Sequence, residues 1–79
     1  MSEESKQAIR KTVGQTIKNL RQVKNISQEE LATLAGVHRT YIGMVERGEK
    51  NVTIVTLHRL SEALGVPPAE LLKGFGRGE

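Results

Sequence analysis

The chain has 79 residues, with twelve Lys and Arg side chains against nine acidic ones, all of them Glu, and it has no Cys. The lack of cysteine excludes a disulfide framework, a thiolate nucleophile and a cysteine zinc site, and the lack of Asp argues against a Ser-His-Asp triad. At this length we expect one core and one domain, rather than an enzyme with an interdomain cleft, and no cofactor.

No apolar run approaches the ~20 residues that span a membrane, and the mostly polar first residues do not form a signal peptide. We therefore expect a cytoplasmic protein without a membrane partner. Positive charge is concentrated in residues 1–26, whereas residues 60–79 are slightly acidic. This distribution is expected of a protein that binds a polyanion on one face and a protein partner on the other. The alternative is that these are ordinary solvated surface charges.

The first periodic stretch predicts a helix over residues 6–24. Its apolar residues are spaced by three or four positions and form one stripe: Ile9, Val13, Ile17 and Leu20. Asn25 is expected to end this helix in the left-handed conformation that normally requires glycine.

Residues 27–35 predict a second helix that begins with a capping box. Ser27 stands at the N-cap and Glu30 follows three residues later, so the hydroxyl and the carboxylate each accept a backbone hydrogen bond. Gly36 ends this helix. We assign its inner face to Leu31, Leu34 and Ala35.

A third helix is expected over residues 38–47, with Ile42 and Val45 pointing inward. A fourth helix follows a plausible N-cap at Thr53 and ends at Gly65. Its inner residues are Ile54, Leu57, Leu60 and Leu64.

Two prolines at 67–68 begin a short fifth helix that contains Leu71 and Leu72, because proline fits the first turn of a helix. No segment alternates as a strand would. We therefore predict an all-α domain of five helices over residues 1–73 and a flexible tail over residues 74–79.

Residues 27–47 hold the most informative pattern. The turn at Gly36 joins two short helices, the first of which places the small Ala32 where a facing helix comes close. Ile42 and Val45 anchor the second. These steric demands together are typical of a helix-turn-helix, in which two helices cross tightly. An ordinary αα-hairpin is the alternative interpretation.

The segment SQEELATLAGVHRTYIGMVERG resembles the helix-turn-helix of the lambda-repressor-like, xenobiotic-response-element type of DNA-binding domain, and the resemblance extends from Val13 to Leu72. HRTYIGMVERGEKNVTIVTLHRLSEALGV is similar to the controller proteins of restriction-modification systems. This resemblance implies a homodimeric transcriptional regulator that binds double-stranded DNA at a palindromic operator. It implies autoregulation as well, with RNA polymerase as a candidate partner.

Arg39, Thr40 and Met44 are the candidate base contacts, because the first turn and the solvent face of a recognition helix point at base edges. Arg39 is long enough to bind guanine O6 and N7 with two hydrogen bonds. Thr40 suits a base edge or a phosphate, and Met44 suits a thymine methyl group. The alternatives are a solvated arginine, a threonine bonded to its own backbone and an exposed methionine without a contact.

The candidate phosphate contacts surround this helix: Gln28, Tyr41, Gly43, Arg47, Lys50 and Asn51. The amide of Gln28 lies at a helix N-terminus, which favours anions, and the family resemblance supports this role. A glycine inside a helix costs ~1 kcal/mol relative to alanine, and close approach of the DNA backbone at Gly43 would explain it. The alternatives are close packing at Gly43, a purely structural Tyr41 and a solvated turn after Arg47.

The resemblance also implies a partly buried ion pair between Arg21 and Glu46, so we do not count Arg21 as a DNA contact. It further implies that the C-terminal helices form the dimer interface. Adjacent leucines cannot both face one interior on a 3.6-residue period, so one of the pair at 71–72 is available for another surface. We assign the interface to Val66, Leu71, Leu72 and Phe75. A monomer whose fifth helix covers the core is the alternative.

Two other functions remain open on the same scaffold. One is an antitoxin or a phage-type repressor, which also binds DNA. The other is a protein-interaction adaptor that has lost DNA binding, against which three cations on one face argue: Arg39, Arg47 and Lys50. The sequence shows no sign of a small-molecule effector.

Overall fold

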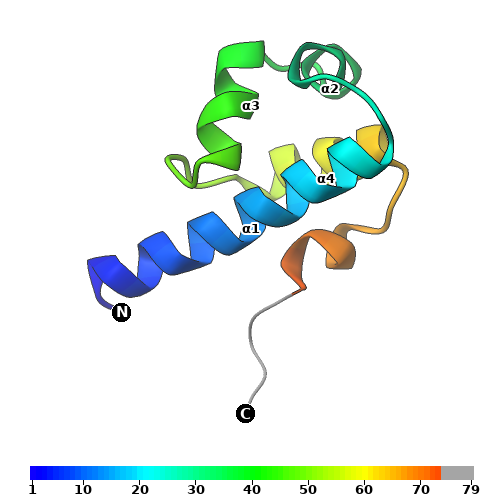
Figure 1. Ribbon diagram of the computed structural model, residues 1–79. Helices are drawn as coiled ribbons and strands as arrows, with labels where there is room; N and C mark the ends of the chain where they lie inside the picture. The colour runs from blue at the N-terminus through cyan, green and yellow to red at the C-terminus, as the bar shows by residue number, and fades with distance from the viewer. Residues whose placement is uncertain (74–79) are drawn as a thin grey trace.

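The computed structural model describes residues 1–73; the tail expected over residues 74–79, with Phe75, lies outside the described residues. The described chain is entirely helical, which confirms the predicted all-α class (Figure 1). Its elements are α1 (Glu3–Val23), α2 (Gln28–Ala35), α3 (Arg39–Glu46), α4 (Ile54–Leu64) and the 3₁₀ helix η1 (Pro68–Leu72). None of the helices in residues 1–73 is both long enough and apolar enough to cross a membrane.

The expected fifth helix is a five-residue 3₁₀ segment, so the described chain has four α-helices. Pro67 and Pro68 have no N–H to donate, and Glu70 N donates to Pro67 O at 2.9 Å in the tighter 3₁₀ pattern. Such a short element gains its order from packing against the other helices rather than from its own hydrogen bonds.

α1 begins earlier than predicted, because Ser2 caps it. The Ser2 hydroxyl accepts a hydrogen bond from Ser5 N at 3.0 Å, and two glutamates in the first turn favour the helix N-terminus. The long helix crosses the molecule, and its N-terminal end extends beyond the other helices in Figure 1. Asn25, at φ 61°, adopts the predicted left-handed conformation after the helix ends.

The predicted caps of the later helices are present. Ser27 Oγ accepts from Glu30 N at 2.9 Å, and Glu30 Oε1 accepts from Ser27 N at 2.7 Å, which completes the capping box. Gly36 at φ 73° and Gly65 at φ 71° end α2 and α4. The hydroxyl of Thr53 caps α4 through Thr56 N. Local chemistry therefore sets where these helices begin and end.

The core contains buried apolar side chains from every element: Val13, Ile17, Leu31, Ala32, Ala35, Ile42, Val45, Leu60, Leu64 and Leu71. Two predicted inner residues are wrong. Leu34 is 59% exposed, because packing at Ala32 turns the buried face of α2 away from it. Ile54 is 85% exposed, because it opens α4 beyond the edge of the core. Ile9 is only half-buried for a similar reason.

Candidate nucleic-acid interface

α2 and α3 form the predicted helix-turn-helix, with Gly36 turning the chain between them. Ala32 is buried where the two helices meet, and Ile42 and Val45 are buried on the inner side of α3. His38 is the N-cap of α3: its Nδ1 accepts a hydrogen bond from Thr40 N at 3.1 Å. The core holds one side of α3 in place while its first turn faces solvent.

Two of the three predicted base contacts occupy that exposed first turn. Arg39 and Thr40 are exposed, and Met44 is half-buried one turn further along. Arg39 Nη1 lies 3.9 Å from Glu29 Oε2, and both side chains are exposed. At this distance the contact is weak, so the guanidinium is free to turn toward another acceptor.

Arg47, Lys50 and Asn51 are exposed at the end of α3 and in the loop that follows. Arg47 forms two hydrogen bonds with Glu49, from Nε at 2.9 Å and from Nη2 at 3.2 Å. These bonds lower the pKa of Glu49 and raise the pKa of Arg47. In this structure the guanidinium of Arg47, which we predicted to bind a phosphate, binds the carboxylate of Glu49 instead.

Gly43 is buried beneath side chains of this chain. A Cβ at this position would lie 3.2 Å from Arg47 Nη1 and 3.8 Å from Gln28 Oε1. In this conformation Arg47 and Gln28 lie next to Gly43, so a phosphate reaches Gly43 only after these side chains move, and the phosphate contact at Gly43 stays a prediction. Tyr41 is half-buried and packs against the core.

The predicted ion pair forms between α1 and α3. Arg21 Nε donates to Glu46 Oε2 at 2.7 Å, and Nη2 donates to Oε1 at 3.1 Å. Their side chains are 12% and 3% exposed. Arg21 also donates to the Ile26 carbonyl at 3.0 Å, and the Gln28 amide donates to Glu46 Oε1 at 2.9 Å. The hydrogen bonds to Glu46 raise the pKa of Arg21. Together with the Gln28 bond they satisfy a carboxylate that would be costly to bury alone.

The roles of Gly14 and Arg10 at the boundary between α1 and α3 were missed. A Cβ on Gly14 would overlap the Val45 carbonyl oxygen, so the backbones of α1 and α3 meet directly there. Arg10 Nε donates to the Gly48 carbonyl at 3.1 Å and thereby ties α1 to the loop after α3. The signal for Gly14 was present, because glycine is unfavourable inside a helix unless something else needs the space.

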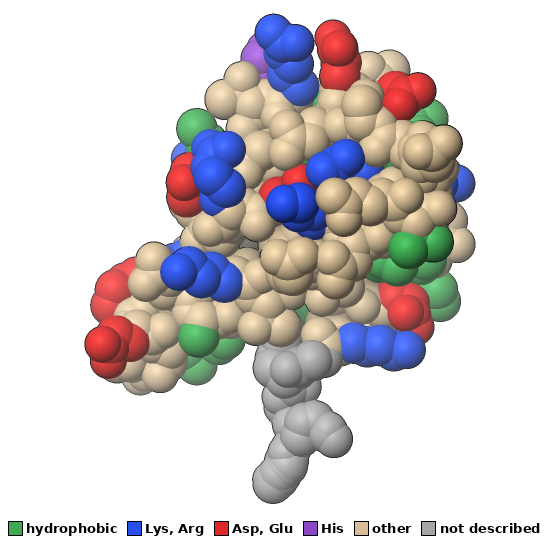
Figure 2. Space-filling model, in the orientation of Figure 1, with side chains coloured by type: hydrophobic (Ala, Val, Ile, Leu, Met, Phe, Trp, Pro, Cys, Tyr) green, Lys and Arg blue, Asp and Glu red, His purple; other side chains and the backbone are tan. Residues whose placement is uncertain are grey.

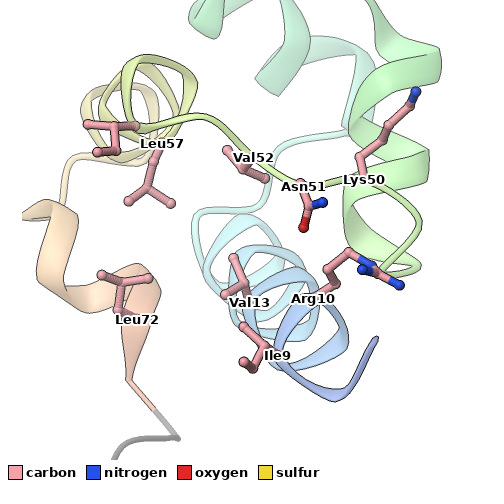
Figure 3. A pocket seen from close by; sticks show the side chains of 9 residues that line it. Ile9, Arg10, Val13, Lys50, Asn51, Val52, Leu57 and Leu72 are labelled. Carbon is pink, nitrogen blue, oxygen red and sulfur yellow. The ribbon is translucent and has the colours of Figure 1, made fainter. Parts of the chain in front are cut away.

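The C-terminal end of the described chain exposes apolar surface. Leu71 is fully buried, which makes it a core residue rather than the interface residue we assigned, whereas Leu72 is 45% exposed. Val66 is half-buried. A pocket of ≈ 330 Å³ lies beside Leu72, with side chains from α1 on one side and from α4 and η1 on the other (Figure 3). Ile54 also lines it.

Among residues 1–73, no group of three or more His, Cys, Asp or Glu side chains is placed to hold a metal ion. The site described above contains cations, amides and hydroxyl groups around a short helix whose first turn is exposed. Groups of this kind bind phosphates and the edges of bases.

The helix-turn-helix family matches residues 17–71, and the chain belongs to this family of DNA-binding transcription regulators. Control protein C.SmaI of Serratia marcescens is 45% identical over 68 residues, which are 86% of this chain and 81% of that protein. Control protein C.BamHI of Bacillus amyloliquefaciens is 46% identical over 65 residues, 81% of this chain and 80% of the relative.

A solved structure supports the same assignment. The restriction-modification controller protein C.AhdI of Aeromonas hydrophila superposes with a TM-score of 0.80 at 45% identity. The match covers 81% of this chain and 97% of that protein. The resemblance to restriction-modification controller proteins is thus confirmed.

Proposed function

We propose that the chain binds a palindromic DNA operator as a homodimer and regulates transcription as a restriction-modification controller protein. The observation that carries this proposal is the first turn of α3, where Arg39 and Thr40 are exposed while the opposite side of the helix is fixed in the core. A helix held in this way enters the major groove of DNA as one rigid unit.

Arg39 is the specificity-determining residue in this proposal. Its exposed guanidinium gives up a weak contact with Glu29 and forms two hydrogen bonds with a guanine. Thr40 contacts a base edge from the same turn, and Met44 contacts a thymine methyl group from the next.

The DNA backbone is bound on both sides of α3. Arg47, Lys50 and Asn51 bind phosphates from the loop side, and Arg47 exchanges Glu49 for a phosphate oxygen. Gln28 is the first residue of α2, whose N-terminal dipole attracts an anion. The Gln28 amide exchanges its bond with Glu46 for a phosphate in order to take part. The Tyr41 hydroxyl supplies a further phosphate contact.

The dimer in this proposal forms at the C-terminal end through Leu72 and the half-buried Val66. Leu72 and Ile54 offer exposed apolar surface at the pocket. Phe75 was assigned to the same interface and lies outside the described residues. Two recognition helices about 34 Å apart then read the two halves of a palindrome.

Sedimentation at micromolar concentration tests the dimer. The parent chain should sediment as a dimer, and Leu72→Glu should sediment as a monomer. Leu34→Glu is the matched control, because Leu34 is more exposed than Leu72 but lies on α2. A monomeric parent that binds a palindrome without cooperativity would contradict this interface.

The proposal places the protein in the cytoplasm on the nucleoid, with RNA polymerase as a partner at the promoter. The support is the similarity to control proteins. A pull-down of the polymerase on operator DNA, with and without the protein, measures this contact. If the protein does not increase the amount of polymerase retained, RNA polymerase is not its partner.

Selection of bound sequences from a pool of random duplexes tests the DNA-binding proposal as a whole. We expect enrichment of a site with two-fold symmetry whose half-sites are centred about one helical turn apart. A protein-interaction adaptor that has lost DNA binding would enrich no sequence. Enrichment of a single half-site without two-fold symmetry would contradict binding as a dimer.

A further inference from the structure

Within residues 1–73, some Lys and Arg side chains have no carboxylate within 4.0 Å. They are Lys6, Lys11, Lys18, Lys24, Lys50 and Arg59. Lys50 already belongs to the proposed interface. The lysines of α1 do not, and Lys11 precedes the residues matched by the helix-turn-helix family.

Lys11 and Lys18 lie seven residues apart and therefore share one face of α1, separated by about 10.5 Å along the helix axis. Gly14 lies between them and packs directly on the Val45 carbonyl of α3. The face that carries both lysines therefore borders the C-terminal end of α3. Figure 2 shows Lys and Arg side chains over α1 and α3 together on one side of the molecule.

Lys11 is also in contact with the loop after α3. A Cβ on Gly48 would lie 2.6 Å from Lys11 Cγ, so the stem of Lys11 covers the residue that follows Arg47. Arg10 fixes the same junction through its hydrogen bond to the Gly48 carbonyl. The backbone and the first part of the Lys11 side chain are thus packed on the residue that follows Arg47, so the position of Lys11 relative to α3 is set by direct contact.

We propose that the Lys11–Lys18 face of α1 is a further binding surface for the phosphodiester backbone, next to the loop that carries Arg47 and Lys50. This inference rests on the proposed DNA binding. The acidic first turn, with Glu3 and Glu4, repels phosphate and limits the surface to the middle of α1. The lysines contact phosphates and add affinity without reading sequence.

Lys24, the C-cap residue of α1, provides a matched control. It is exposed and has no carboxylate partner among residues 1–73. On a 3.6-residue period its position is turned well away from the face of Lys11 and Lys18. A Cβ on Gly65 would lie 3.9 Å from its Nζ, which places Lys24 at the end of α4. Removing its charge should leave DNA binding nearly unchanged.

The test measures binding of the full chain to a 30-base-pair duplex of random sequence by fluorescence anisotropy, between 50 and 200 mM salt. The salt slope is the fall in log affinity per unit of log salt concentration. Loss of two phosphate contacts in Lys11→Gln/Lys18→Gln should lower this slope by about two units. Between the two salt concentrations the affinity of the variant should therefore fall by a factor about ten times smaller than that of the parent. Lys11→Arg/Lys18→Arg should keep the parent slope, and Lys24→Gln should match the parent. Thermal melting confirms that each variant is folded.

An unchanged slope in the folded Lys11→Gln/Lys18→Gln variant would overturn this inference and leave the proposed function standing. An equal fall in Lys24→Gln would also overturn it, because net charge rather than position would then be responsible. A parent chain that binds no duplex at any salt concentration would overturn both the inference and the proposed function.

Discussion

Two Arg–Glu pairs flank the C-terminal end of α3 and differ chiefly in burial. Arg21 and Glu46 are joined by two hydrogen bonds, as are Arg47 and Glu49. The side chains of the first pair are 12% and 3% exposed, and those of the second are 60% and 53% exposed. The same chemistry therefore operates in two different environments.

Burial determines what each pair can do. Neither member of a buried pair can lose its partner without leaving a charge away from water. Water replaces the partner of an exposed ion at little cost. The Arg21–Glu46 pair thus fixes α3 against α1, whereas the Arg47–Glu49 pair can open and make Arg47 available to a phosphate. α3 is anchored on one side and accessible on the other.

Breaking the buried pair should have the largest effect on stability. Glu46→Ala leaves Arg21 without its carboxylate and should cost about 3–5 kcal/mol of folding free energy. For a domain of this size the melting temperature should fall by at least about 10 °C. Thermal unfolding measures the loss, and Glu49→Ala serves as the matched control, whose melting temperature should fall far less because the Arg47–Glu49 pair is exposed. Full stability with lost DNA binding would mean that Glu46 belongs to the interface instead.

The two glycines buried within helices of the described chain, Gly14 and Gly43, should respond in opposite ways to alanine. Gly14→Ala forces α1 away from the Val45 carbonyl, and such overpacking costs about 1–3 kcal/mol. Gly43→Ala meets the exposed side-chain end of Arg47 and makes an ordinary contact with Gln28. It should be neutral, or stabilising by up to about 1 kcal/mol through helix propensity. Chemical denaturation of both variants measures the contrast. Equal destabilisation would contradict the direct packing of α1 on α3.

Lys50 should contribute to the affinity for DNA without contributing to the preference for one DNA sequence over another. Lys50→Gln removes one cation from the loop and should lower the salt slope by about one unit on every sequence. Binding titrations on the selected operator and on a random duplex, each at several salt concentrations, measure it. A changed sequence preference with an unchanged slope would contradict a phosphate contact.

Opening the exposed pair should have the smallest effect. Glu49→Gln removes an anion beside Arg47 and should tighten DNA binding by about twofold to threefold, the scale of one exposed ion pair. Unchanged or weaker binding would mean that Glu49 orients Arg47 for DNA rather than competing for it.

The same pair gives a pH dependence of known sign. Because Arg47 lowers the pKa of Glu49 in the folded chain, the pair contributes stability above the ordinary glutamate range. This contribution is lost as the pH falls through the lowered pKa. Thermal melts of the parent and Glu49→Gln should therefore differ at neutral pH and converge in acid. A difference that grows toward acid would have the wrong sign.

The sequence predicts features whose cause is local. Ser27 and Glu30 form their capping box within one turn, and Asn25 adopts its left-handed conformation at the end of its own helix. Helical periodicity gave most of the core, but it failed for Leu34 and Ile54. In both cases the buried face depends on where a neighbouring helix lies, which the residues of one helix do not specify.

Features that join distant segments were missed or assigned differently. The contact of Gly14 with Val45 and the bond from Arg10 to Gly48 each join residues more than thirty positions apart. Gln28 was predicted only as a phosphate contact, and its hydrogen bond to Glu46 was missed. The exposure of Arg39 and Thr40 on α3 could be predicted, because Ile42 and Val45 fix the orientation of that helix, whereas the burial of Gly43 was not predicted.

Whether the exposed side of α3 reads DNA is tested most directly by the affinity of Arg39→Ala for its selected operator relative to a random duplex. Discrimination between the two should fall by about 1–3 kcal/mol, while the melting temperature stays at the parent value. Equal losses of affinity on both duplexes would make Arg39 a phosphate contact, and the claim that this turn reads the operator through Arg39 would be contradicted.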